Sequence, residues 1–152
     1  MYRVQDIARY IINYSYKKEY VTSNLKLQKL LYLVQSYFLM VKQEPCFSEK
    51  IRAWDFGPVV PEVYREYVKY GACMLPPVRK YYVGTRKFEY TDAIIDEDDK
   101  KLINQVLDKF ADYSSTQLVT LTQHQNPWID AYIPRANNEI TKKAIESYFR
   151  ED

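Results

Sequence analysis

Apolar side chains recur three and four residues apart along most of the chain, which is the spacing of one face of an α-helix. The pattern predicts a first helix over about residues 4–16 and a central helix over residues 25–41. Two apolar rows run down the central helix, so we expect the rest of the fold to surround it. Thr22 or Ser23 can cap its first free N–H groups. The rows contain Leu27, Leu30, Leu31, Val34, Phe38 and Val41, and Leu33, Tyr37 and Met40.

Glycine and proline set the geometry of the segment that follows the central helix. Residues 51–56 are expected to be extended or a short strand, and Gly57-Pro58 is expected to force a turn. Pro61 suits the first position of another helix, where a backbone N–H is not needed. Gly71 can end that helix as a left-handed cap. The inner face of this helix is predicted to carry Val63, Tyr64, Tyr67 and Val68.

The second half of the chain predicts a β-hairpin and then further helices. Residues 78–83 and 86–90 read as two strands joined around Gly84-Thr85. Helix starts follow at the acidic residues 96–99, at a capping box of Ser114 and Gln117, at Asn126-Pro127, and at Thr141. The sequence therefore predicts a mainly α protein, a compact single-domain helical bundle of about six or seven helices with a small β-hairpin, spanning residues 1–152.

Composition narrows the choice of partners and compartment. Lys+Arg 22 against Asp+Glu 20 gives a net charge of +2, too balanced to indicate a nucleic-acid or membrane partner. The 16 tyrosines suit half-buried positions and contact surfaces. Cys46 and Cys73, with no leading apolar segment and no apolar run of about 18 residues, lead us to expect a reduced, cytoplasmic protein without a disulfide.

The candidate chemistry does not predict an active site. His124 is the only histidine, and Cys46 and Cys73 lack the paired spacing of a metal site. A Cys–His nucleophile is formally open but has no local motif. We expect His124 to hydrogen-bond to the backbone or to cap a helix end near Trp128. We therefore expect no enzyme, no metal and no cofactor.

Two further features each have a structural and a functional interpretation. The four acids at residues 96–99 are explained by capping and by the helix dipole, rather than by a metal site. Trp54 is interpreted as a core anchor that finds one partner for its indole N–H, and the alternative is a platform on which a ligand stacks.

One set of motifs contains polar residues and prolines at positions that an amphipathic pattern alone does not require. It reads Lys-Leu-Gln-Lys-Leu-Leu-Tyr at 26–32, then Gln35, Ala53-Trp54 and Gly57-Pro58-Val59-Val60-Pro61, with His124 and Pro127-Trp128 later. These motifs resemble the Panacea domain of the SocA-like antitoxin family, which is also known as the phage-associated protein GepA family. We expect the following motif residues to be structural: Leu27, Gln28, Leu30, Leu31, Tyr32, Gln35, Trp54, Gly57, Pro58, Val59, Pro61, Tyr64, His124 and Trp128.

The resemblance implies an antitoxin of a bacterium or prophage that neutralises a cognate protein toxin by direct binding. The residues themselves indicate only a tyrosine-rich helical domain, which is compatible with a binding protein. Tyrosine is favoured in interface cores and lysine affects encounter rates, so the candidate contacts are Tyr67, Tyr70, Tyr81 and Tyr82 with Lys26 and Lys29. The alternative is a DNA-binding transcriptional regulator of a mobile element, and a homo-oligomer stays open.

Overall fold

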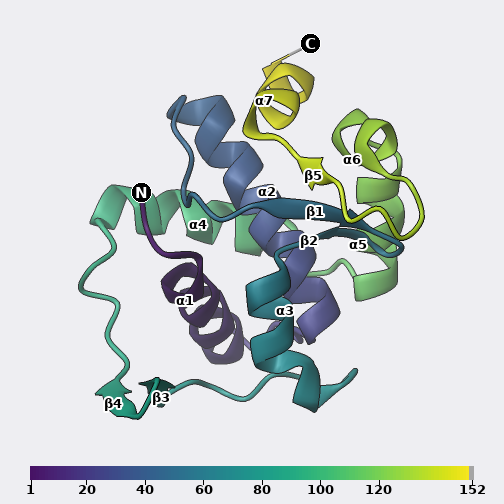
Figure 1. Cartoon of the computed structure of the whole chain (residues 1–152). Coiled ribbons are helices and arrows are strands. Elements are labelled where there is room, and N and C mark those ends of the chain that lie inside the picture. The colour runs from purple at the N-terminus through teal and green to yellow at the C-terminus, as the bar shows by residue number, and fades with distance from the viewer. Residues whose placement is uncertain (151–152) are drawn as a thin grey trace.

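Helix α2 (Asn24–Val41) runs through the middle of the molecule, and most other elements pack around it (Figure 1). The computed structural model describes residues 1–150. Helix α2 contacts α1, α3, α4, α5, α7 and strand β2. The remaining helices are α1 (Val4–Lys17), α3 (Pro61–Tyr67), the short 3-10 helix η1 (Val68–Tyr70), α4 (Glu97–Lys109), α5 (Ser115–Gln123), α6 (Asn126–Ala131) and α7 (Lys142–Arg150). The prediction of a mainly α fold with a buried central helix is confirmed.

A small antiparallel sheet lies against this helical body, and the sequence pattern did not predict it as a sheet. Strand β1 (Ile51–Trp54) pairs with β2 (Gly57–Val59) on one side and with β5 (Glu139–Ile140) on the other. Residues 51–56 were expected to be extended, but partner strands of two and three residues are too short to show a period of two. Gly57-Pro58 was expected to form the turn, yet the turn lies two residues earlier, at residues 55–56, and Gly57 and Pro58 belong to β2.

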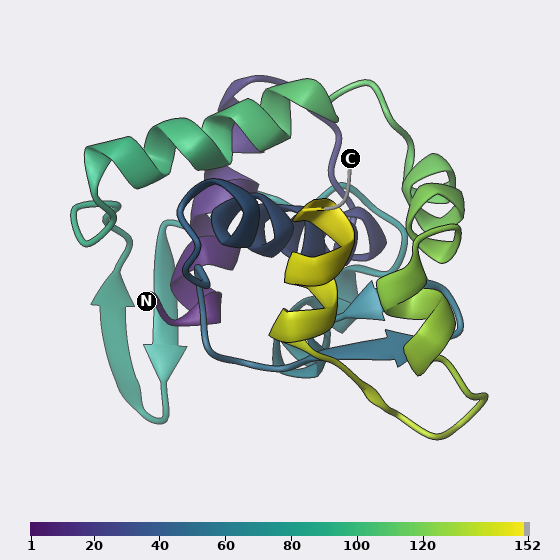
Figure 2. The ribbon, with the colours of Figure 1, turned by 90° about the horizontal axis from the view of Figure 1, so that it is seen from above.

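The predicted β-hairpin is confirmed as strands β3 (Lys80–Val83) and β4 (Arg86–Glu89). Figure 2 shows this hairpin at the edge of the molecule, away from the three-stranded sheet.

Side chains cap three of the helix starts that the sequence predicted. Ser23, not Thr22, caps α2 by accepting a hydrogen bond from the Lys26 N–H at 3.2 Å. The capping box at Ser114 is present, and the Thr141 hydroxyl accepts from the Ala144 N–H at 3.0 Å. The N-cap of α6 is Gln125, one residue before the predicted Asn126. Assigned helix ends commonly differ by one or two residues, so a shift of one residue is small. Pro127 still marks the first turn of α6, as predicted.

The acids at the start of α4 do not cap it through the side chain of the N-cap residue. Asp96 occupies the N-cap position but makes no side-chain capping bond. Asp99 is buried, and its carboxylate accepts hydrogen bonds from the Tyr2 hydroxyl and from the Lys42 ammonium. The capping part of the interpretation is therefore wrong, and Asp99 instead ties the first residues of the chain and the end of α2 to α4.

Three predicted inner positions are exposed. Met40 and Val41 are 41% and 60% exposed in the last turn of α2, which extends past its neighbours. Val68 is 49% exposed because the chain tightens into η1 after Tyr67, which rotates the next side chain off the α-helical stripe.

Polar side chains of α2 hold the irregular backbone that surrounds the helix. Gln35 is buried, donates to the Phe47 carbonyl at 2.8 Å and accepts from the Cys46 and Phe47 N–H groups at 2.7 and 3.3 Å. Gln28 accepts from the Val60 N–H at 3.0 Å, next to the start of α3. A loop packed against a core needs such partners, since its own backbone groups are withdrawn from water.

The role of Gln35 can be tested by replacing it with leucine, which has a similar volume and no hydrogen-bonding group. Gln35→Leu leaves backbone groups of Cys46 and Phe47 buried without partners, so we expect a loss of about 3 kcal/mol in the free energy of unfolding, measured by urea denaturation. The control is Gln105→Leu on the exposed face of α4, which should change stability by less than about 0.5 kcal/mol. Equal effects at the two positions would contradict this role.

Candidate functional site

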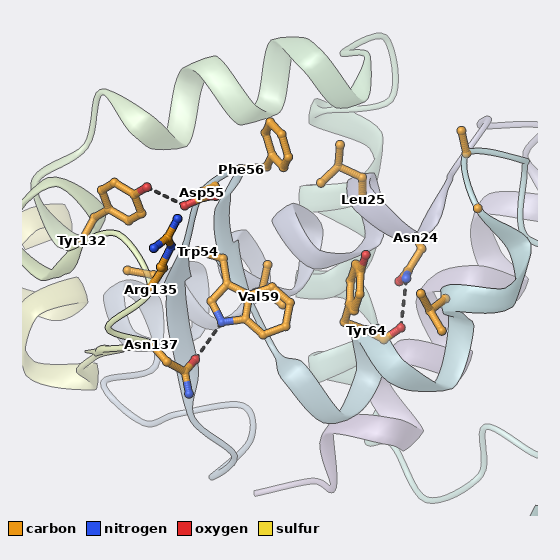
Figure 3. Close-up of a pocket in the computed structure, with 14 residues that line it drawn as sticks. Asn24, Leu25, Trp54, Asp55, Phe56, Val59, Tyr64, Tyr132, Arg135 and Asn137 are labelled. Atoms are coloured by element: carbon orange, nitrogen blue, oxygen red, sulfur yellow. Dashed lines mark hydrogen bonds between the residues drawn. The ribbon is translucent and has the colours of Figure 1, made fainter.

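A groove of about 680 Å³ opens between the N-terminal end of α2, the β1–β2 turn, α3 with η1, and the loop that follows α6 (Figure 3). Its lining combines aromatic and aliphatic side chains with a few polar groups, which is typical of binding sites in proteins. The lining residues are Asn24, Leu25, Ala53, Trp54, Asp55, Phe56, Val59, Tyr64, Val68, Gly71, Ala72, Tyr132, Arg135 and Asn137.

Trp54 forms the centre of the groove wall. Its ring packs edge to face against Tyr64, with the ring centroids 5.3 Å apart. Its indole N–H donates to the Asn137 side-chain oxygen at 2.7 Å, and its carbonyl accepts from the Trp128 indole at 2.9 Å. The prediction of one indole partner is confirmed, but the core-anchor interpretation is wrong, because Trp54 is only half-buried and faces the groove.

The polar groups of the groove mostly satisfy one another. Asp55 accepts from the Tyr132 hydroxyl at 2.5 Å, and this hydrogen bond raises the pKa of Tyr132. Asn24 donates to the Tyr64 carbonyl at 3.0 Å. Arg135 differs, since no carboxylate of residues 1–150 lies within 4.0 Å of its guanidinium.

Apolar side chains at the groove rim are open to solvent. Phe56 at the β1–β2 turn is 66% exposed, Val68 is 49% exposed, and Leu25 is partly exposed. Solitary exposed apolar residues are ordinary, but several gathered on a groove mark an interaction surface.

A buried lysine supports the β1–β2 hairpin from behind. Lys29 is fully buried and its ammonium donates to the Pro58 carbonyl at 2.9 Å. Burial lowers the pKa of Lys29 to about 7. Gly57 lies against the same side chain with a φ of +99°, and a Cβ there would be 2.9 Å from the Thr122 hydroxyl and 3.1 Å from Lys29 Cε. Glycine is therefore required at this position by both conformation and space.

The reactive side chains do not converge in the described residues. His124 is exposed at the end of α5, with Nδ1 2.7 Å from the Thr120 carbonyl, which confirms the predicted backbone hydrogen bond. Cys46 is buried and burial raises the pKa of its thiol, while Cys73 is an exposed free thiol. Within residues 1–150 there is no group of three or more His, Cys, Asp or Glu placed to hold a metal ion.

Half of the candidate contacts are not on the surface. Lys26, Lys29 and Tyr67 are only 3%, 0% and 6% exposed, so their prediction as exposed contacts is wrong. Each lies on the inner side of its helix, and the Lys26 ammonium donates to the Ala111 carbonyl at 3.1 Å. Tyr70 and Tyr81 are partly buried, and Tyr82 is 65% exposed.

The groove itself was not predicted, although part of it is contained in the family-like motif. Trp54, Val59 and Tyr64 were expected to be structural, and all three line the groove. Phe56, Arg135 and Asn137 carry no sequence signal, because their positions depend on how the β1–β2 turn and the loop after α6 meet.

A sequence model of the family described as "Antitoxin SocA-like, Panacea domain" matches residues 27–129. The chain belongs to this antitoxin family. Antitoxin SocA of Caulobacter vibrioides (strain NA1000 / CB15N) is 54% identical over 43 residues, which cover 28% of this chain and 23% of SocA. The match therefore spans about a quarter of that relative's length. No solved structure matches the chain.

Membership assigns this Panacea domain to antitoxins in general, and its motif residues fall into two groups in space. Gln28, Lys29 and Gln35 hold backbone segments against α2. Trp54 and Tyr64 meet at the groove. None of the helices within residues 1–150 has the length and apolar character needed to cross a bilayer.

The buried lysine predicts a specific pH dependence of stability. The folded pKa of about 7 lies below the ordinary 10.5, so between these values the unfolded chain binds a proton that the folded chain does not. Wild-type stability should then rise with pH in this window relative to Lys29→Met, by up to about 1 kcal/mol per pH unit, and the difference should level off below pH 7. Urea denaturation from pH 6 to about pH 9 measures it. The exposed Lys101→Met is the control, and parallel curves for wild type and Lys29→Met would contradict the assignment.

The contact behind the hairpin can be tested with a pair of glycines that share positive φ. Gly57→Ala combines backbone strain with a steric clash and should lower the free energy of unfolding by about 2–4 kcal/mol. Gly84→Ala has a φ of +62° but open space around it, so we expect a loss of only about 1 kcal/mol. Thermal and urea unfolding compare the two variants, and an equal loss would show that the clash at Gly57 contributes nothing.

Proposed function

We propose that this Panacea domain neutralises a cognate protein toxin by direct, stoichiometric binding in the cytoplasm, and that the groove is the main contact surface. The observation that supports the groove most is its exposed apolar rim around fixed aromatic walls. Phe56 and Val68 stand open to solvent beside Trp54 and Tyr64. Burying such side chains under a partner releases apolar surface from water, which is the main favourable term in protein association.

The walls of the groove are organised before any partner arrives. The Trp54 and Tyr132 side chains are each fixed by a hydrogen bond, to Asn137 and Asp55. A partner side chain that enters therefore need not freeze these rings, and the entropy cost of binding is lower. A volume of about 680 Å³ accommodates a few side chains, which is the size of a binding hot spot rather than of a whole interface.

We infer that neutralisation is binding rather than catalysis. The groove contains Asp55 as its one carboxylate, and that group is engaged by Tyr132. His124, Cys46 and Cys73 are not among its lining residues. An antitoxin that covers a toxin surface needs complementarity and not a nucleophile.

The remaining tyrosine candidates are less favourable anchors for the toxin than the groove. Tyr81 stacks on Phe88, with the centroids 5.6 Å apart, and lies under the Arg9 guanidinium. Tyr70 is partly buried, which leaves Tyr82 as the one of the three with most of its surface free. Their contact with the toxin stays a prediction, and the next experiment includes it.

Rim variants test the groove against the hairpin. Phe56→Ser and Val68→Ser should each weaken binding to the cognate toxin by about tenfold or more, because each removes an apolar anchor, while thermal stability stays near that of wild type. Dissociation constants and growth rescue on co-expression are the measurements.

Val83→Ser on the hairpin is the matched control, since Val83 is 56% exposed and lies outside the groove. If Tyr82→Ser abolished binding while both rim variants bound as wild type, the toxin would dock on the hairpin and the groove assignment would be wrong. A toxin that binds neither wild type nor variants would instead contradict direct neutralisation.

A further inference from the structure

The β3–β4 hairpin is strongly positive, although the net charge of the whole chain is small. Residues 79–89 carry four cations against one acid, Glu89, a net charge of +3, whereas the complete chain carries only +2. The four cations are Arg79, Lys80, Arg86 and Lys87, and all are exposed. None forms an ion pair within 4.0 Å in the described part of the chain. The charge is therefore segregated and free to meet a partner.

The hairpin is held to the body along one face only. Asn13 of α1 donates to the Val78 carbonyl at 2.9 Å and accepts from the Val78 N–H at 2.7 Å. The Arg9 guanidinium lies over the Tyr81 ring, 3.6 Å from its centroid, and Tyr81 stacks on its cross-strand partner Phe88. These contacts fix the face of Tyr81 and Phe88 toward α1.

The opposite face carries two of the four cations, Lys80 and Lys87, and the one acid. Side chains alternate along a strand, so Lys80 and Tyr82 share the other face with Glu89 and Lys87, which lie directly opposite them in the register. Tyr82 is 65% exposed. The two-stranded ribbon lies at the edge of the molecule, with no third strand beside it among residues 1–150 (Figures 1 and 2). The outer face thus presents Tyr82 beside two lysines and Glu89, while the Arg86 guanidinium lies on the other face, 5.1 Å from the Phe88 ring centroid.

This surface suits a phosphate backbone better than a protein interface. Lysine is depleted in protein interface cores, and the outer face offers Tyr82 as its one large anchor. A phosphate backbone, in contrast, binds solvated cations favourably, because each phosphate that a cation neutralises releases condensed counterions. Unpaired lysines and arginines on a projecting ribbon are what such binding uses.

We propose that the β3–β4 hairpin binds duplex DNA, with its cations on the phosphates and its outer face against the major groove. Strands of four residues are about 14 Å long, which matches a major groove about 12 Å wide that admits a two-stranded ribbon. The deep, narrow major groove of duplex RNA excludes such a ribbon. The hairpin is separate from the toxin groove, so this activity does not depend on the proposed neutralisation.

Fluorescence anisotropy with a labelled synthetic duplex of about 20 base pairs tests the proposal on the full chain without any toxin. Three or four phosphate contacts predict that log K falls with log salt concentration with a slope of about −3 between about 50 and 200 mM NaCl. Lys80→Gln/Lys87→Gln should reduce the slope by about 2 and weaken binding at low salt by about tenfold or more. The matched control, Lys101→Gln/Lys143→Gln, removes two exposed lysines from helices α4 and α7 and should bind nearly as wild type.

Three outcomes would overturn the proposal. The first is that the wild type does not bind the duplex at about 50 mM NaCl. The second is an equal loss of DNA affinity in the hairpin and control variants. The third is tighter binding to the corresponding single strand than to the duplex. Circular dichroism and thermal unfolding verify that each variant is folded. We expect this result because the four replaced lysines, at positions 80, 87, 101 and 143, are all exposed. If the hairpin variants lost toxin binding while wild type ignored DNA, the cations would serve an acidic protein partner instead.

Discussion

The fold depends on hydrogen bonds that a buried helix makes to backbone outside it. Helix α2 is enclosed on most sides, yet it contains Gln28, Lys29 and Gln35 at 0% or 1% exposure. Each of these side chains bonds to a backbone group outside the helix, at Val60, at Pro58 on strand β2, and at residues 46–47. An unpaired buried backbone group costs about 1–3 kcal/mol, so the helix can bury these segments only by satisfying them.

The same contacts position the groove. Pro58 lies within β2 and Val60 is the N-cap of α3, and the central helix holds both. This places the β1–β2 turn over the N-terminal end of α2 and brings Trp54 against Tyr64 at the head of α3. A groove supported by a buried core is rigid, which suits a surface that must recognise a partner without first reorganising.

The two proposed surfaces differ in their physical chemistry. The groove presents apolar rims and rings with satisfied polar groups, and it would act through burial. The hairpin presents unpaired cations on a ribbon held by Asn13 and Arg9, and it would act through counterion release. A single domain with both surfaces could hold a toxin and a nucleic acid at the same time.

The sequence by itself determined the helices, the caps at Ser114 and Thr141, the hairpin and the family, because these depend on local periodicity, capping residues and a distinctive motif. It also indicated one indole partner for Trp54 and the backbone bond of His124. Only the tertiary structure decided which polar residues are buried, since Lys26 and Lys29 look like surface lysines until the segments that cover them are in place. The same is true of the groove, where Phe56, Arg135 and Asn137 come together from turns far apart in the chain. Contacts between residues so far apart depend on long-range packing, which produces no periodic or spaced pattern in the sequence.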